Sequence, residues 1–202
     1  KENVYETDLF LPIIEKIGEL SGKKYQDFKK EFRIIADHIK ASVFLASEGI
    51  VPSNVEQGYI LRRLLRRVMR YGKTLEMPKD FLSELIKIVV EIYQSVYPEL
   101  QKKQEDAIFI VRQEQEKFEK TLENGLKEFA TATGGVPSEG GKKLLSGKDA
   151  FNLYQTYGFP IEITEDLAKE KGIKVDIEEF KKELERHQEM SRTASAGMFK
   201  GG

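Results

Sequence analysis

Residues 58–73 read GYILRRLLRRVMRYGK, a stretch with five arginines, one lysine and no acidic residue. With about 100° of rotation per residue, the arginines of a helix built from this stretch fall within roughly 140° of one face. They are Arg62, Arg63, Arg66, Arg67 and Arg70. The opposite face carries apolar residues, namely Leu61, Leu64, Leu65, Val68 and Met69. The stretch therefore predicts an amphipathic helix with one packed face and one cationic face.

The cationic face needs a counter-charge, because like charges four residues apart on a helix repel by about 0.2–0.5 kcal/mol per pair. Glutamates on neighbouring helices, a membrane surface, a partner helix or a polyanion would each supply one. Guanidinium groups match phosphate geometry better than lysine ammonium groups do. The choice of arginine thus favours nucleic acid, while neutralisation within the chain stays open as the alternative.

The composition is that of a globular protein: 202 residues, 40% hydrophobic and 33% charged, with a net charge of −1. No apolar run is long enough to span a bilayer, and the first residues lack the pattern of a secretory signal. We therefore expect a cytoplasmic protein with no membrane partner. The chain has no cysteine, and His38 and His187 lie far apart, so we expect no metal site.

Helical spacing of apolar residues extends along nearly the whole chain and predicts an all-α fold with at most a minor short β element. We expect Asp8 to cap a helix that ends at Gly22, and Gly72 to be the C′ residue of the arginine helix. Other helices are expected at about 25–47, 79–96, 98–131, 148–157, 164–171 and 177–191.

Two of these helices show a clear apolar stripe. In the helix at 25–47 the stripe consists of Phe28, Phe32, Ile35, Ile39, Val43 and Ala46. In the helix at 98–131 it consists of Ile108, Val111, Gln115, Phe118 and Leu122. His38 lies beside the first stripe, so we expect it to have a hydrogen-bonded structural role.

The segment TGGVPSEGGKKLLSG, residues 133–147, is rich in Gly, Ser and Pro and predicts a flexible loop. It would divide a helical bundle, residues 1–132, from a smaller C-terminal helical subdomain, residues 148–194. Residues 195–202 show no cap or stop signal, so we expect a disordered tail and a natural chain that continues beyond it.

Local signals also define the helices of the second part. Ser146 is expected to cap the helix that follows it, and Gly158 to end that helix. Thr164 is expected to begin the next helix, and Asp176 with Glu179 forms a capping-box pattern before the last one.

A longer stretch around the arginines, RIIADHIKASVFLASEGIVPSNVEQGYILRRLLRRVMRYGK at residues 33–73, resembles a signature of alanyl-tRNA synthetases. Three further matches occur in the order that this family shows. They are YETDLF at 5–10, NLYQTYGFPIEIT at 152–164 and MSRTASAGMF at 190–199.

This resemblance implies a helical tRNA-recognition region that lies between an aminoacylation domain and an editing domain. The full-length enzyme would attach alanine to tRNA(Ala) with ATP and Mg²⁺, and its editing domain would hold Zn²⁺. The present chain would bind the acceptor stem beside the neighbouring domains of the same polypeptide. It would hold no cofactor and no catalytic residue, and would be inactive alone.

The resemblance also implies individual roles. The identity element of this family is a G·U wobble pair in the acceptor stem, and Asn54 matches an asparagine that contacts it; a role as helix N-cap is open beside this one. Gln155 stands where the family has an aspartate reader. An amide donates as well as accepts and carries no charge, so we expect weaker discrimination unless Glu162 compensates. Phosphate contacts are expected from Arg62, Arg63, Arg66 and Arg67, with Arg70 and Lys73 as weaker candidates.

A rival hypothesis belongs to another class of protein. The chain would be a helical interaction scaffold whose arginine face docks on an acidic protein. The salt dependence of RNA binding separates the two, because each phosphate contact releases counterions.

Overall fold

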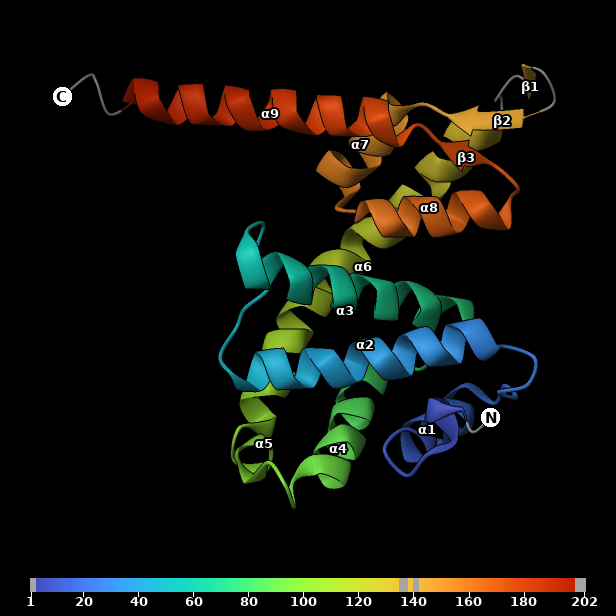
Figure 1. Cartoon of the computed structure of the whole chain (residues 1–202), viewed down its shortest axis with the longest axis vertical. Helices are drawn as coiled ribbons and strands as arrows, with labels where there is room; N and C mark the ends of the chain where they lie inside the picture. The colour runs from blue at the N-terminus through green and yellow to red at the C-terminus, as the bar shows by residue number, and fades with distance from the viewer. Residues whose placement is uncertain (1–2, 135–137, 140–141, 199–202) are drawn as a thin grey trace. The chain divides into compact units, whose positions relative to one another are not determined.

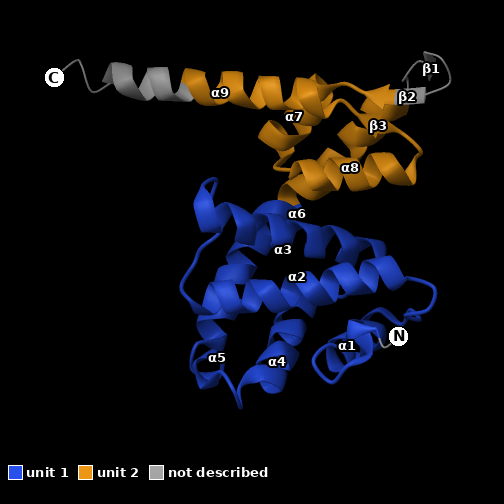
Figure 2. Ribbon diagram, in the orientation of Figure 1, with its two compact units in different colours: residues 1–119 blue, residues 120–202 orange. Residues whose placement is uncertain are grey.

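The structure, a computed structural model, describes residues 3–134, 138–139 and 142–198, and most of these residues are helical (Figure 1). The chain divides into two compact units, residues 1–119 and 120–202 (Figure 2). The boundary between the two units falls inside a helix, between residues 119 and 120. Each unit is described by itself below.

Unit 1 is built from six helical elements and the first part of a seventh. The short 3-10 helix η1 (Val4–Glu6) precedes α1 (Leu11–Ser21), α2 (Lys29–Ser47) and α3 (Glu56–Thr74). They are followed by α4 (Phe81–Tyr93), α5 (Pro98–Lys102) and α6 (Gln104–Gly134), which continues into unit 2. Helix α2 is the central element, because it packs against α1, α3, α4 and α5 (Figure 1).

Unit 2 combines helices with very short strands. Strands β1 (Ser138–Glu139) and β2 (Lys142–Leu145) precede α7 (Gly147–Tyr157) and α8 (Ile161–Glu170), and β3 (Lys174–Val175) leads into α9 (Ile177–Met198). Strand β2 pairs antiparallel with β1 and parallel with β3, with Leu145 opposite Val175. The predicted all-α fold with a minor β element is thus confirmed.

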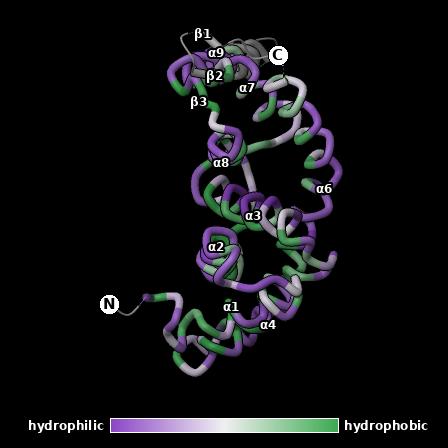
Figure 3. The backbone as a smooth tube through the Cα atoms, turned by 90° about the vertical axis from the view of Figure 1, so that its right-hand side faces the viewer, coloured by the Kyte–Doolittle hydropathy of each residue, from purple (hydrophilic) through white to green (hydrophobic). Residues whose placement is uncertain are grey.

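The predicted apolar stripes form much of the core. In α2 every stripe residue from Phe32 to Ala46 is buried, and Phe28 is half-buried just before the helix. In α6 all five predicted seam residues are buried. Figure 3 shows hydrophilic and hydrophobic residues alternating along the helices, as amphipathic helices require.

Several helix ends differ from the predictions. Asp8 does not cap α1, which begins at Leu11 with a proline in its first turn, although Gly22 ends it with a φ of 67°. Gly72 does not end α3 but lies inside it. A Cβ at this position would come 2.5 Å from Cζ of Phe81, so close packing requires the glycine. Helix α8 begins at Ile161, so Thr164 lies in its interior and is buried.

Other predicted boundaries shift as well. The long helix expected to open at Pro98 is two helices, α5 and α6. The segment predicted as a loop holds the last residues of α6 and the strands β1 and β2, and its residues 135–137 and 140–141 lie outside the described residues. The predicted tail is helical up to Met198, and 199–202 lie outside the described residues.

Candidate nucleic-acid interface

The turn that carries Asn54 is held against the start of α3. The Ser53 amide donates to the carbonyl of Gly58 at 3.0 Å, and the Ser53 hydroxyl donates to the carbonyl of Val55 at 3.0 Å. Glu56 follows with a φ of 49°, a left-handed conformation that costs a non-glycine residue about 1–2 kcal/mol. Contacts to the helix therefore hold this turn in a conformation that its own sequence does not favour.

The side chain of Asn54 is exposed, and its amide oxygen accepts a hydrogen bond from Nη1 of Arg62. Helix α3 begins after Val55 and has no side-chain cap, so the alternative role of Asn54 as N-cap is wrong. Arginine is only a donor, which assigns the bonded atom of the amide as Oδ1. Among the described residues Nδ2 has no hydrogen-bond partner, and because the side chain is exposed this donor is available to a ligand.

Glu114 of α6 neutralises part of the arginine face. This carboxylate is 2% exposed, and its Oε1 lies 2.6 Å from both Nε and Nη2 of Arg66. Nε of Arg62 is 3.5 Å from the same oxygen. The guanidinium of Arg66 also stacks over the ring of Phe118, with 4.9 Å to the ring centroid. The expectation of a purely cationic face is therefore corrected, because Glu114 neutralises charge at Arg62 and Arg66.

Two other arginines also have partners inside unit 1. Nη1 of Arg67 lies 2.9 Å from Nε2 of His38. Because arginine can only donate, Nε2 is the acceptor and carries no proton. This contact agrees with the hydrogen-bonded structural role expected for His38. Burial, followed by the charge of Arg67, lowers the pKa of His38, and the carboxylate of Asp37 opposes this shift. Arg70 is 4% exposed and lies 4.3 Å from the ring centroid of Tyr71, so it does not belong to a surface row.

The remaining predicted residues occupy different environments. Arg63 is half-buried and Lys73 is exposed, both on α3. Gln155 is exposed on α7, and Glu162 is half-buried in the first turn of α8. Asn54 and the arginines thus share unit 1, whereas Gln155 and Glu162 belong to unit 2.

Glu114 was missed by the sequence reasoning, although a signal was present. It lies three residues after Val111 and four before Phe118, on the buried seam of α6. A carboxylate at a seam position is seldom buried without a cationic partner. The arginines of α3 were the available candidates for this partner.

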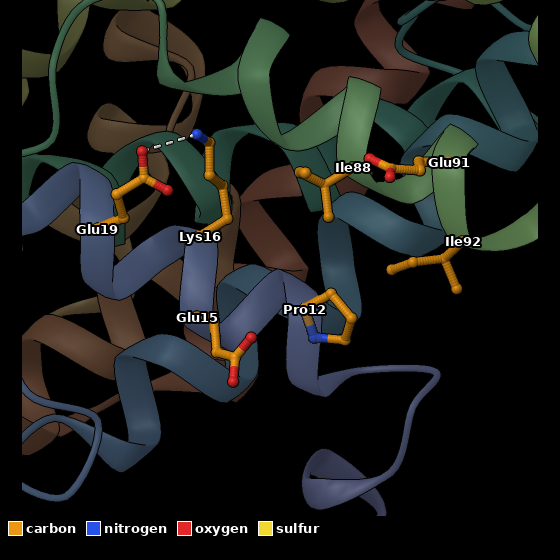
Figure 4. Close-up of a pocket in the computed structure, with 7 residues that line it drawn as sticks. All are labelled: Pro12, Glu15, Lys16, Glu19, Ile88, Glu91 and Ile92. Atoms are coloured by element: carbon orange, nitrogen blue, oxygen red, sulfur yellow. Dashed lines mark hydrogen bonds and ion pairs between the residues drawn. The ribbon is translucent and has the colours of Figure 1, made fainter.

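A groove of about 470 Å³ between α1 and α4 is acidic, unlike the arginine-bearing face of α3 (Figure 4). Glu15, Glu19 and Glu91 line it, and its one cation, Lys16, is bonded to Glu19 at 3.0 Å. Carboxylates in excess repel phosphates. The groove is therefore unsuited to RNA.

The described part of the chain lacks two further features. Within it, no three His, Asp or Glu side chains come close enough together to hold a metal ion. Among the same residues, no helix is both long and apolar enough to cross a membrane.

Gly58 gives a direct test of how the turn is held. A Cβ at this position would lie 2.2 Å from Oγ of Ser53 and 2.5 Å from the carbonyl oxygen of Val51. We expect Gly58→Ala to displace the turn and to lower the free energy of unfolding by about 1–3 kcal/mol, the usual cost of overpacking. Urea denaturation measures this change.

The matched control is Gly18→Ala in α1, where a Cβ would meet no atom closer than 3.6 Å. This variant should be neutral or gain up to about 1 kcal/mol, because alanine favours the helix. Equal stability of the two variants would show that the turn does not press on Gly58.

Comparisons with known proteins show which family the chain is related to. The family profile described as "tRNA synthetases class II (A)" matches residues 1–200. The chain belongs to this family.

The similar proteins within this family are alanine–tRNA ligases. The chain is 45% identical to an alanine–tRNA ligase of Borrelia hermsii over 100% of its length. It is 44% identical to that of Lactococcus lactis over 98% of its length, and 40% identical to that of Bacillus pumilus over 94%. The chain spans 34% of the Borrelia protein and 22% of each of the other two, so it is homologous to one part of these ligases.

Proposed function

We propose that this chain binds the acceptor stem of tRNA(Ala) within an alanine–tRNA ligase and contributes to reading the G·U wobble pair. The observation that supports this most directly is the environment of Asn54. Its turn is held against α3, its amide oxygen is occupied by Arg62, and its amide nitrogen has no partner among the described residues of this exposed side chain. A rigid, exposed polar group of this kind suits a base edge in the wide minor groove of an RNA stem.

The G·U pair offers a different hydrogen-bonding group to each of the two amide side chains, Asn54 and Gln155. A wobble shift leaves the guanine 2-amino group without its usual partner in the minor groove, where the O2 carbonyl of uracil also lies. Nδ2 of Asn54 can donate to a carbonyl oxygen, and the side-chain oxygen of Gln155 can accept from an amino group. Gln155 is exposed, as this role requires, but it lacks the charge of a carboxylate. We therefore expect discrimination to rely more on Asn54.

Phosphate binding would rest on fewer groups than the motif suggests. Lys73 is exposed and Arg63 is half-buried, so these two side chains are the better placed. Arg66 is held by Glu114, and Arg70 is buried. Their geometry supports structural roles instead.

The rest of the enzyme would supply the chemistry. The full-length ligase would activate alanine with ATP and Mg²⁺ and transfer it to the tRNA, and Zn²⁺ would serve its editing domain. The present chain would position the stem, hold no cofactor and show no ligase activity by itself. An acidic protein partner, the rival hypothesis, would have to compete with Glu114 for Arg62 and Arg66.

The test titrates acceptor-stem hairpins with G·U or G·C at the identity position, at two salt concentrations. For Asn54→Ala we expect the preference for G·U to fall by about 2- to 10-fold, the worth of one hydrogen bond, with little loss of overall affinity. Fluorescence anisotropy measures both quantities. Gln155→Asp is the informative companion and should raise the preference.

Equal weakening of Asn54→Ala toward both hairpins would contradict a reading role. Binding with no preference in the wild type, together with a shallow dependence on salt, would favour the protein-scaffold hypothesis.

A further inference from the structure

Arg62 has its donor groups directed toward the protein. Nη1 donates to Oδ1 of Asn54, Nη2 donates to the carbonyl of Pro52 at 3.3 Å, and Nε lies 3.5 Å from the buried carboxylate of Glu114. Its side chain is 21% exposed. A guanidinium with these three contacts has few donors left for a phosphate.

The contacts of Arg62 join three parts of unit 1. Its backbone belongs to α3, its Nε faces α6, and its two terminal nitrogens reach the turn on both sides of Ser53. A planar fork that bonds both a side chain and a backbone carbonyl restricts rotation of the amide as well as movement of the turn. Gly58 supports the same turn through Ser53 but does not contact the amide.

Together these contacts determine which face of Asn54 meets the solvent. Without Arg62 the amide could rotate and present either its oxygen or its nitrogen, since both have similar size. A reader that presents both atoms distinguishes poorly between a carbonyl and an amino group on a base edge.

We infer that Arg62 is a positioning residue for Asn54: it binds the amide oxygen, keeps the amide nitrogen outward, and contributes to recognition through Asn54 rather than through a phosphate. This inference rests on the proposed function. It replaces the phosphate-binding role that the arginine motif predicts for this position.

The two roles make opposite predictions for RNA binding. A phosphate contact adds affinity for any sequence, and its loss reduces the slope of log K against log salt by about 0.7–0.9. A positioning residue leaves this slope unchanged, and its loss reduces the preference between stems.

The experiment compares Arg62→Met, Arg62→Lys and Asn54→Ala in the 202-residue chain, with the same G·U and G·C hairpins at several salt concentrations. Methionine keeps an unbranched side chain without charge. Lysine keeps the charge but has a single ammonium in place of the fork. Arg63→Ala on the same helix is the control for a phosphate contact, and circular dichroism verifies that each variant is folded.

We expect Arg62→Met and Arg62→Lys to lose as much preference as Asn54→Ala, with an unchanged salt slope. The double variant Asn54→Ala/Arg62→Met should lose no more than Asn54→Ala alone, since both act through one group. A reduced slope in Arg62→Met with the preference retained would overturn the inference.

A measurement without RNA separates this inference from the proposed function. The NMR signals of the Asn54 side-chain amide, assigned by their loss in Asn54→Ala, should shift in Arg62→Met and Arg62→Lys but not in Arg63→Ala. A wild-type chain without preference would overturn the proposed function, and these signals would then decide the positioning. Unchanged signals in both Arg62 variants would overturn it.

Discussion

Arg66→Ala is expected to lower the free energy of unfolding by about 3–5 kcal/mol, the usual cost of removing one partner from a buried ion pair. Glu114 is 2% exposed, and both Nε and Nη2 of Arg66 lie 2.6 Å from its Oε1. After the substitution the carboxylate keeps Arg62, whose Nε is 3.5 Å away, so the loss should lie at the lower end of this range. Urea denaturation followed by circular dichroism measures the loss.

Two controls assign this loss to the pair. Lys73→Ala removes an exposed cation from the same helix and should change stability by less than about 0.5 kcal/mol. The double variant Arg66→Met/Glu114→Leu should recover much of the stability, because apolar residues replace a buried pair without leaving a charge behind. A loss below about 1 kcal/mol for Arg66→Ala would show that Glu114 does not depend on Arg66.

This prediction also changes how RNA-binding data on the motif should be interpreted. Arg66→Ala would weaken RNA binding through partial unfolding of unit 1, with no phosphate contact involved. Variants at Lys73 and Arg63 test phosphate binding more directly, since Lys73 is exposed and Arg63 is half-buried.

Gly147→Ala is expected to destabilise unit 2 by about 3 kcal/mol, at the upper end of the overpacking range. A Cβ at Gly147 would lie 2.2 Å from the amide nitrogen of Phe180 and 2.5 Å from Cβ of Glu179. The clashing atoms include the backbone of α9, and one residue of a helix cannot shift without moving its neighbours. The Gly147 amide also donates to Oε2 of Glu179 at 2.7 Å, so separating the two helices would break this bond.

Hydrogen exchange is the suitable measurement, because it reports on each unit separately. Protection should fall in α7 and α9 and stay unchanged in α2 and α3. Gly134→Ala, where an added Cβ would meet no atom within 4 Å, is the matched control in unit 2. Unchanged protection in α7 after Gly147→Ala would contradict the close approach of the two helices.

Much of the fold follows from local sequence patterns. The residues of α2 from Phe32 to Ala46 recur at helical spacing, and they are buried as predicted. Local capping signals also worked at both ends of α7. Ser146 accepts from the amide of Asp149 at 3.1 Å, and Gly158 ends α7 with a φ of 68°.

The capping box before α9 is a local pattern that predicted only one of its two hydrogen bonds correctly. Asp176 accepts from the amide of Glu179 at 2.9 Å, as the pattern predicts. The carboxylate of Glu179 instead binds the amide of Gly147, which is 32 residues away in the sequence. The reciprocal half of the box is absent because a group from another helix is the partner.

For the candidate site, the sequence by itself determined the family, the arginine helix and the turn with Asn54. These features depend on residue identity and on spacings of a few residues. Tertiary structure alone decided which arginines reach solvent, because Arg66 and Glu114 are 48 residues apart in the sequence and meet only when α3 packs on α6. Helical periodicity assigns a side chain to a face, whereas the charges that oppose this face come from whichever helix lies against it.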